Sequence, residues 1–476
     1  ATERCGIQRY TFPEGESAVF LNLKKAMNWD FTNDSYIEII DSCTIQGYRF
    51  SEGWARGQHV YFRTRFSKPF AWVEMDTTAI ALKGKRVGTA YIARFNFDTE
   101  KGEQIVLSTA LSGVSMEGAA KNMAAEAPHN DFDKYLAETK DNWNRQLGKI
   151  EVTGDNKDDK VNFYTALYHT MIAPTIYSDV DGAYYGPDKK IHQTDGWVNY
   201  GTFSLWDTYR NYHQLMTLVY PERQMDMIHT MMGMYKEHGW FPKWELYGRE
   251  TLTMEGDPSI PVLVDSWMKG LQDFDIDEAY KGMYKSATTP GKDNLMRPDN
   301  DDYMSKGYVP MESQYDNSVS HALEYYVADY ALSTLAEALG KKEDAKLFRK
   351  RSMGYKNYYS KDFGTLRPIT KEGKFYEPFD PKEGANFAPS PGFHEGNSWN
   401  YTFYVPHDVY GLAKLMGGKK PFIDKLQMVF DEGLYDPANE PDIAYAHLFS
   451  YFKGEEWRTQ KETQRLIDKY FTTKPD

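Results

Sequence analysis

Apolar and polar residues alternate along the chain up to about residue 112, and turn residues interrupt the alternation at 32–34, 51–53 and 101–102. A period of two is the pattern of strands that bury one face. Several short strands spaced in this way predict an antiparallel β-sandwich. The alternating stretches are AVFLNL, YIEIIDSCTIQGYRF, HVYFRTRFSKPFAWVEM, TAYIARFNF and QIVLSTALSG.

The pattern changes at Ser115. SMEGAAKNMAAEA and DFDKYLAETKDNWNRQLGKI predict two connecting helices, with Pro128 between them and Asp131 as a suitable N-cap of the second. Farther on, NSVSHALEYYVADYALSTLAEALG repeats apolar residues every three or four positions, and Gly340 is placed to end this helix. Pro421 is predicted at the first position of a later helix.

Long loops rich in Gly, Pro, Trp and Asp join the helical segments, and loops of this length in a compact domain are usually functional. We therefore predict a ring of helix pairs, the (α/α)6 barrel, with its site where the loops converge. The fold class is multidomain β + α. The predicted domains are a β-sandwich (1–114), linker helices (115–154) and a barrel that forms the catalytic domain (155–476).

Composition narrows the function classes. Aromatic residues make up 15% of the chain, which suits a sugar-binding cleft, although a large aromatic core explains the number equally well. The net charge of −13 argues against a nucleic-acid partner and suits a neutral polyol or a hard cation. No run of 18 apolar residues exists, so no membrane span is predicted. Whether Cys5 and Cys43 pair stays open.

Three loop segments combine a carboxylate with aromatic residues and Gly or Asn. Each carboxylate also has a purely structural interpretation. Asp207 suits an N-cap or a partner of Arg210, Glu395 a solvated loop residue, and Glu440 a turn acid before proline. The segments are GTFSLWDTYRNYH with Trp206 and Asp207, FHEGNSWNY with Glu395 and Asn397, and DPANEPDIAYAHLF with Asn439 and Glu440.

Other polar residues are interpreted as structural. Glu255, Asp257 and Asp265 are expected to be acids beside a helix start. The histidines lack a spacing such as HExxH and are expected to be hydrogen-bonding residues rather than metal ligands. These histidines are His169, His213, His321, His394, His407 and His447.

Carboxylates among aromatic rings suit the cleavage of a glycosidic bond. One carboxylic acid protonates the leaving oxygen, and a second carboxylate acts as nucleophile or as base for water. A ring-lined pocket raises the pKa of the acid, so that it keeps its proton near neutral pH. Glu395 has such neighbours along the sequence in Trp399, Tyr401 and Tyr404.

The carboxylate segments are part of a wider resemblance that runs nearly the whole length of the chain. The chain resembles glycoside hydrolase family 92, the calcium-dependent α-mannosidases that invert configuration. The resemblance implies the same sandwich, linker helices and (α/α)6 barrel. The segments that carry it include GYRFSEGWA, VYFRTRFSKPF, FYTALYHTMIAP, YGTFSLWDTYRNYHQLMTLVYP, FHEGNSWNYTFYVPHDV and NEPDIAYAHLFSYFKGE.

The resemblance also implies roles for individual residues. Glu395 matches the general acid, and Asp207 matches the aspartate that contacts the terminal mannose. Asn439 and Glu440 lie at the mannose and the calcium, with Glu440 as the expected metal ligand. Ca²⁺ is implied as a cofactor that helps distort the sugar ring. Trp206 and Asn397, in the same segments, are expected to bind substrate.

Two parts of the family pattern are expected outside these residues. The family begins with a glycine-rich segment, and its base lies in a GNDD-like segment that would follow TTKPD. We therefore expect a partial sandwich and an incomplete barrel. The base Asp is expected beyond residue 476, and the 476 residues alone are expected to be inactive or nearly so.

The predicted function is hydrolysis of terminal α-linked mannose from mannosides or N-glycans with inversion, in a periplasmic or extracellular compartment. One alternative is another (α/α)6 α-glycosidase of the trehalase or glucoamylase kind, which needs no calcium. A second alternative is a non-catalytic mannan-binding protein. The sequence does not set the mannosidic linkage or the oligomeric state.

Overall fold

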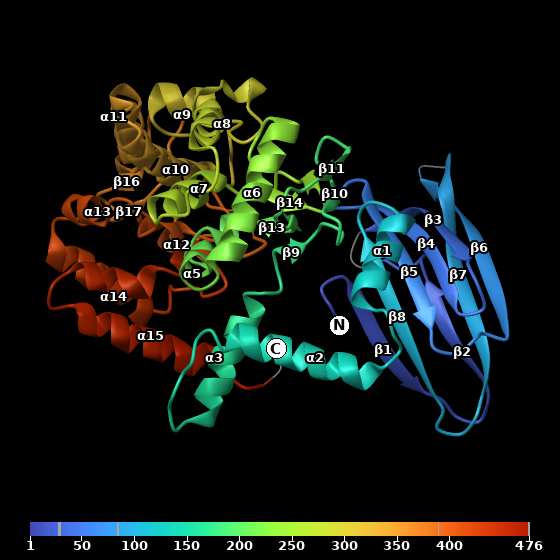
Figure 1. Cartoon of the computed structure of the whole chain (residues 1–476). Coiled ribbons are helices and arrows are strands. Elements are labelled where there is room, and N and C mark those ends of the chain that lie inside the picture. Colours follow the sequence, from blue (N-terminus) through green and yellow to red (C-terminus); the bar gives the residue numbers. More distant parts are fainter. Residues whose placement is uncertain (27–29, 83–84, 389, 475–476) are drawn as a thin grey trace.

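The structure is a computed structural model that describes residues 1–26, 30–82, 85–388 and 390–474. Strands form one side of the molecule and helices the other, with helix α2 running between them (Figure 1). The predicted order of antiparallel sheets followed by a helical region is confirmed.

The strands form two packed antiparallel sheets, with strand orders β1-β8-β5-β4-β3 and β2-β7-β6. Phe62 and Phe66 from the first sheet pack with Phe95 and Phe97 from the second in one buried cluster. The apolar side of each predicted alternation therefore fills the space between the sheets. The strands are β1 (Cys5–Thr11), β2 (Gly15–Asn22), β3 (Phe31–Ile39), β4 (Thr44–Glu52), β5 (Gln58–Phe66), β6 (Trp72–Leu82), β7 (Lys85–Thr99) and β8 (Gln104–Ser112).

Two details of the sandwich bear on what the sequence pattern predicted or left open. The predicted turn at 32–34 is wrong, because these residues lie inside β3, where a register shift between Thr32 and Asp34 marks a bulge against β4. Turn-forming residue types are common at such irregularities. Cys5 is buried in β1, Cys43 lies between β3 and β4, and both are free thiols in this structure.

The two linker helices are α1 (Met116–Glu126) and α2 (Phe132–Leu147), as predicted. The Asp131 carboxylate accepts a hydrogen bond of 3.0 Å from the backbone N–H of Lys134, which confirms Asp131 as the N-cap of α2. This bond satisfies one of the donors that every helix start leaves without a partner.

The helical region is organised around α10 (Ser318–Ala338), which is buried on nearly all its faces. Gly340 follows α10 with a φ of 73°, a left-handed conformation that glycine adopts without strain. Pro421 is the third residue of α14 rather than its first, because the helix begins at Lys419. The other helices are α3 (Lys157–His169), α4 (Leu205–Thr208), α5 (Tyr212–Val219), α6 (Pro221–His238), α7 (Ser259–Met268), α8 (Ile276–Thr288), α9 (Asn300–Lys306), α11 (Lys342–Ser352), α12 (Ser398–Thr402), α13 (Val409–Leu415), α14 (Lys419–Asp431) and α15 (Glu456–Tyr470).

Short strand pairs extend from the helical region toward the sandwich (Figure 1). Trp54 of the sandwich packs on Trp244 with 4.6 Å between ring centroids, and its indole N–H donates to Thr253 Oγ1 at 2.9 Å. Ser112 Oγ donates to Asp179 at 2.7 Å. The strands are β9 (Thr175–Ile176) with β12 (Tyr200–Gly201), β10 (Ala183–Tyr185) with β11 (Ile191–Gln193), and β13 (Phe203–Ser204) with β14 (Trp244–Leu246) and β15 (Arg249–Glu250). A separate pair, β16 (Tyr359–Ser360) with β17 (Thr365–Leu366), lies among the helices on the side away from the sandwich (Figure 1).

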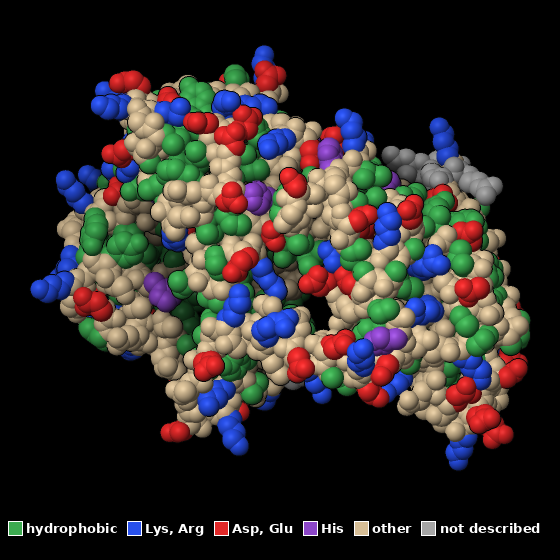
Figure 2. All heavy atoms as spheres, in the orientation of Figure 1, with side chains coloured by type: hydrophobic (Ala, Val, Ile, Leu, Met, Phe, Trp, Pro, Cys, Tyr) green, Lys and Arg blue, Asp and Glu red, His purple; other side chains and the backbone are tan. Residues whose placement is uncertain are grey.

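Acidic and basic side chains are interspersed over both halves on the face shown in Figure 2. Within the part of the chain that the structure describes, no helix is long and apolar enough to cross a membrane.

Replacing Gly47 by alanine tests the close approach of β3 and β4. A Cβ at Gly47 would lie 1.9 Å from the carbonyl oxygen of Tyr36, so the backbone must shift. Overpacking of this kind costs about 1–3 kcal/mol or more. We expect Gly47→Ala to lower the thermal unfolding midpoint by several degrees. Gly6→Ala is the matched control, since a Cβ there meets no described atom within 4 Å. Equal midpoints for the two variants would contradict the packing.

Candidate active site

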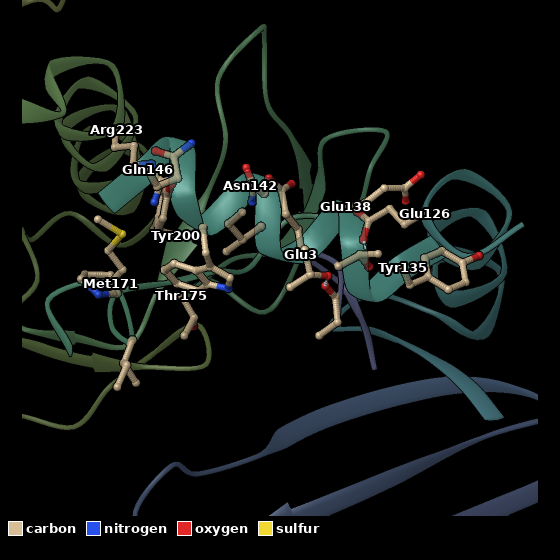
Figure 3. Close-up of a pocket in the computed structure, with 17 residues that line it drawn as sticks. Glu3, Glu126, Tyr135, Glu138, Asn142, Gln146, Met171, Thr175, Tyr200 and Arg223 are labelled. Atoms are coloured by element: carbon tan, nitrogen blue, oxygen red, sulfur yellow. Dashed lines mark hydrogen bonds between the residues drawn. The ribbon is translucent and has the colours of Figure 1, made fainter. Parts of the chain in front are cut away.

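One pocket of the structure lies apart from the predicted site residues. It has a volume of about 580 Å³ and lies between α2 and the segment 171–176. Figure 3 shows Glu138, Asn142 and Gln146 of α2 along one of its walls. None of the three carboxylate segments lines this pocket. The candidate active site lies instead where those segments meet.

The three predicted segments come together in the structure. The side-chain amide of Asn439 donates a hydrogen bond of 3.2 Å to the backbone carbonyl of Glu395. Burial raises the pKa of Asp207 to about 7, and the neighbouring carboxyls of Glu440 and Glu395 add to the shift while Arg210 opposes it. Loops that are far apart in the sequence thus place three carboxyl groups in one electrostatic cluster.

The backbone at Glu395 is held in an uncommon conformation. Its φ is 49°, in the left-handed region that a residue with a Cβ adopts only under constraint. The surrounding bonds supply that constraint. Tyr401 Oη donates to the carbonyl of His394 at 2.6 Å, and Ser390 Oγ donates to that of Gly396 at 2.9 Å. The turn therefore presents the Glu395 side chain in one direction.

The electrostatic surroundings favour the protonated form of Glu395. Burial raises the pKa of its carboxyl, His394 opposes this, and the charges of Glu440 and Glu255 add to the increase. The Glu395 side chain keeps 20% of its surface exposed, so it remains accessible from solvent. A carboxylic acid with this combination suits proton donation.

A buried chain of His and Glu lies behind Glu395. Nε2 of His394 lies 3.9 Å from Glu395 Oε1, and its Nδ1 lies 3.2 Å from Glu255 Oε1. Nε2 of His321 lies 2.6 Å from the other oxygen of Glu255. Burial alone would raise the pKa of Glu255, but the two histidines outweigh it and leave that pKa below its ordinary value. The expectation of a helix-start acid was therefore wrong for Glu255.

The other two acids of that segment have different surroundings. Asp257 is buried, and its Oδ2 lies 2.9 Å from Nε of the buried Arg297. It precedes α7 but serves as the partner of a buried cation. Asp265 lies in the second turn of α7 and pairs at the surface with Lys269. His213 contacts Gln224 and Thr208 through its two ring nitrogens, as expected of a hydrogen-bonding residue. Nε2 of His407 lies 2.9 Å from the carbonyl oxygen of Ser352.

Arg210 pairs with Glu324 rather than with Asp207. Its Nη2 lies 2.7 Å from Glu324 Oε1, and both side chains are almost completely buried. Its guanidinium also packs on the ring of Tyr404, 4.6 Å from the centroid. The bland interpretation of Asp207 as the partner of Arg210 is therefore wrong. Asp207 is not an N-cap either, because Ser204 has that position in α4.

Trp206 is completely buried and offers no surface to a ligand in this structure. Its ring lies 4.9 Å from the Arg210 guanidinium and meets His394 edge to face. The structure thus replaces the expected substrate contact by a supporting position behind the site. Trp206 therefore lies against Arg210 and His394.

The side-chain amides of Asn397 and Asn439 differ in which of their hydrogen-bonding groups have a partner in the protein. Asn397 is the N-cap of α12, and its amide oxygen accepts from the N–H of Trp399 at 2.9 Å. Its amide nitrogen donates to the carbonyl of Gly384, which leaves one N–H for another partner. Asn439 is 2% exposed, and its amide oxygen has no hydrogen-bond partner among the described residues.

These residues fit a hard cation. Asp207 and Glu440 present carboxyl oxygens to each other, and Asn439 adds a buried oxygen that has no partner among the residues the structure describes. Oxygen ligands of this kind are those that Ca²⁺ prefers. Like charges held this close need a proton or a cation between them, and the raised pKa of Asp207 reflects that need.

Comparison with known proteins identifies the family. The sequence profile of the glycosyl hydrolase family 92 catalytic domain matches residues 118–476. The profile of the family 92 N-terminal domain matches residues 1–112. The chain therefore belongs to glycoside hydrolase family 92.

Solved structures of the family are similar to the chain. The α-mannosidase BT3965 of Bacteroides thetaiotaomicron is 31% identical with a TM-score of 0.90 over 100% of this chain and 64% of its own. The inverting mannosidase BT2199 of the same organism is 26% identical with a TM-score of 0.88, over 100% of this chain and 67% of its own. A protein of Arthroderma benhamiae, described as an uncharacterized secreted glycosidase, is 26% identical over 72% of this chain. The chain spans 44% of that protein's length.

Sequence reasoning missed the layer beneath the carboxylates, which consists of Glu255, His321 and Glu324. Glu255 was assigned from its neighbours along the chain, but its partners are His321 on α10 and His394 in the loop before α12. A signal for the other two was available, since His321 and Glu324 interrupt the apolar run of α10 at helical spacing. Polar residues within an apolar helix need buried partners.

Replacing Asp207 by asparagine tests the crowding of carboxyl groups by its effect on pH-dependent stability. The folded-state pKa of Asp207, about 7, lies above the unfolded value near 4, so wild-type stability falls as pH rises between them. Asp207→Asn removes this loss. We expect its thermal midpoint, relative to wild type, to be highest at pH 8 and to decline toward pH 5. Asp265→Asn, at the surface, should show no such trend. A constant difference across pH would show that Asp207 is not crowded.

Proposed function

We propose that this chain carries most of the active site of an exo-α-mannosidase that hydrolyses terminal α-linked mannose with inversion. The observation that carries the proposal is the meeting of Glu395, Asp207 and Glu440 in one cluster that raises the pKa of Glu395. The similarity to solved family 92 mannosidases supports the same substrate class.

Glu395 is the proposed general acid. Partial burial beside other carboxyls raises the pKa of its carboxyl and so favours the protonated form, which gives its proton to the oxygen of the departing sugar. The leaving alkoxide of a sugar is strongly basic, so this proton is needed. Inversion requires a second carboxylate about 6.5–9.5 Å away to activate water. The prediction that this residue follows the segment ending at 476 stays a prediction.

The remaining predicted residues are proposed to hold the mannose. Asp207 and Glu440 accept hydrogen bonds from its hydroxyls, and Asn439 keeps the Glu395 turn in place through its amide N–H. Asn397 has one N–H for a sugar hydroxyl. Trp206 acts indirectly, because it packs against Arg210 and His394.

Ca²⁺ is the proposed cofactor, with Glu440 as the protein ligand and the Asn439 oxygen as a second oxygen of the donor set. When bound, such an ion polarises sugar hydroxyls and favours a distorted ring. The protein residues orient the sugar and hold the acid proton. A secreted or periplasmic location is also proposed. The fungal relative, which is described as a secreted glycosidase, supports this location.

Replacing Glu395 by glutamine tests the acid role through the leaving group. For an α-mannobioside we expect kcat to fall by about 10²–10⁴, since the proton donor is lost. For 2,4-dinitrophenyl α-mannoside the loss should be much smaller, because this leaving group departs without protonation. Steady-state kinetics of the full-length protein would measure both, with Glu432→Gln as an exposed control. Equal losses for the two substrates would contradict proton donation by Glu395.

Metal removal tests the cofactor and separates the alternatives. We expect EDTA to abolish mannose release by the full-length protein and added Ca²⁺ to restore it. Glu440→Gln should raise the Ca²⁺ concentration that gives half of the maximal rate, since it removes a charged ligand. Full activity in EDTA, together with turnover of α-glucosides, would favour a trehalase- or glucoamylase-like enzyme. Mannose binding without hydrolysis would favour a mannan-binding protein.

A further inference from the structure

A second polar cluster lies where the β10–β11 hairpin packs against the C-terminal end of α6. It contains one histidine and two carboxylates from separate elements. Asp188 lies in the hairpin turn, His192 on β11 and Glu237 in the last turn of α6. They line a surface pocket of about 490 Å³. None of the residues assigned to the mannose site belongs to this cluster.

The geometry of the cluster is compact. One ligand atom from each of the three residues lies within 4.8 Å of the other two. Nε2 of His192 lies 2.9 Å from Asp188 Oδ1, and its Nδ1 lies 3.8 Å from Glu237 Oε1. Ligand atoms bound to one ion at about 2.0–2.2 Å lie roughly 3–4 Å apart. Small side-chain movements would therefore bring the three residues onto a single ion.

Glu237 provides an independent indication that a ligand is missing. Its side chain is only 8% exposed. Oε1 accepts a hydrogen bond from the Tyr184 hydroxyl, but Oε2 is buried without a partner among the described residues. A buried carboxylate oxygen without a partner is destabilising, more so than a neutral group in the same position. Such an oxygen is stabilised by a cation.

The unpartnered oxygen of Glu237 and the imidazole of His192 both lie beside Gly186. A Cβ placed on Gly186 would lie 2.5 Å from Glu237 Oε2 and 3.1 Å from His192 Nε2. The absence of a side chain at Gly186 therefore leaves space beside both atoms. This space lies at the base of the hairpin, between β10 and α6.

We propose that Asp188, His192 and Glu237 bind a divalent first-row transition metal ion, with Zn²⁺ as the best-suited probe. One imidazole and two carboxylates form a mixed nitrogen and oxygen set, which suits such ions better than Ca²⁺, a cation that takes oxygen ligands. Three protein ligands leave a coordination position for water.

Two charged neighbours bear on the affinity of this site. Lys190 Nζ lies 3.4 Å from Asp188 Oδ2, but its side chain is 76% exposed and free to turn into solvent. Lys236 also lines the pocket. With a neutral imidazole, the three ligands carry two negative charges, which offset the repulsion by these lysines.

The metal would fasten the hairpin to α6. The hairpin also touches the sandwich, since the rings of Tyr185 and His59 lie 5.3 Å apart, and Tyr185 accepts a hydrogen bond from Arg249. An ion at its base would therefore stabilise the contact between the two halves of the molecule. Binding to the folded state alone raises the unfolding midpoint as the ion concentration rises above Kd.

Zn²⁺ titration by calorimetry tests the proposal, using metal-stripped chain in saturating Ca²⁺ so that the proposed mannose site does not contribute. We expect one Zn²⁺ per chain and a rise in the thermal midpoint. His192→Gln and Glu237→Gln should weaken Zn²⁺ binding by at least about 10–100-fold. This is the loss typical for residues that only orient a metal ligand, and a ligand itself should matter at least as much. His229→Gln, which changes another histidine of the pocket, and Glu440→Gln should bind as wild type does.

The outcomes separate this site from the mannosidase proposal. No saturable Zn²⁺ binding, or equal affinity in the His192→Gln and Glu237→Gln variants, would overturn it and leave the role of Glu395 untouched. X-ray absorption of the zinc-loaded wild-type chain does not depend on how the variants fold. One imidazole nitrogen with oxygen ligands is expected, and sulfur or several imidazoles would place the ion elsewhere.

Discussion

Helix α10 must bury three ionisable side chains, and the helical half of the molecule is arranged around that requirement. His321, Glu324 and Asp329 are all nearly inaccessible to water. An unpaired charge in such a place costs several kcal/mol, so each one needs a partner from another segment. Their charged partners are Glu255 for His321, Arg210 for Glu324, and both Arg297 and Arg351 for Asp329.

These pairs place the active-site loops. Glu255 draws His394 toward α10, and His394 adjoins the proposed acid Glu395. Arg210 is drawn to Glu324, which leaves the nearby Asp207 without that cation and facing Glu440 instead. The charged side chains buried around α10 are therefore paired, whereas the carboxyl groups of the proposed active site lie close to one another. Crowded carboxyls lower stability, and they also provide the proton affinity that glycoside cleavage needs.

Local patterns predicted what depends on neighbours along the chain. The alternation of strands, the cap at Asp131 and the stop at Gly340 all follow from residues a few positions apart. The role of Glu255 was beyond such reasoning, because its partner His321 lies on a helix more than sixty residues away. For Glu395, local sequence left a corner residue and a catalyst equally open. The family resemblance pointed to the catalyst, and the clustering of the three loops supports it.

The contacts between the sandwich and the helical half also affect the recombinant production of the separate domains. Trp54 stacks on Trp244, and Ser112 is bonded to the buried Asp179. A recombinant helical region cut at the family boundary near residue 112 would expose the Trp244 ring and leave Asp179 short of a hydrogen bond. We therefore expect this fragment to be less soluble than the whole chain. The two family domains are therefore best cloned and crystallised together.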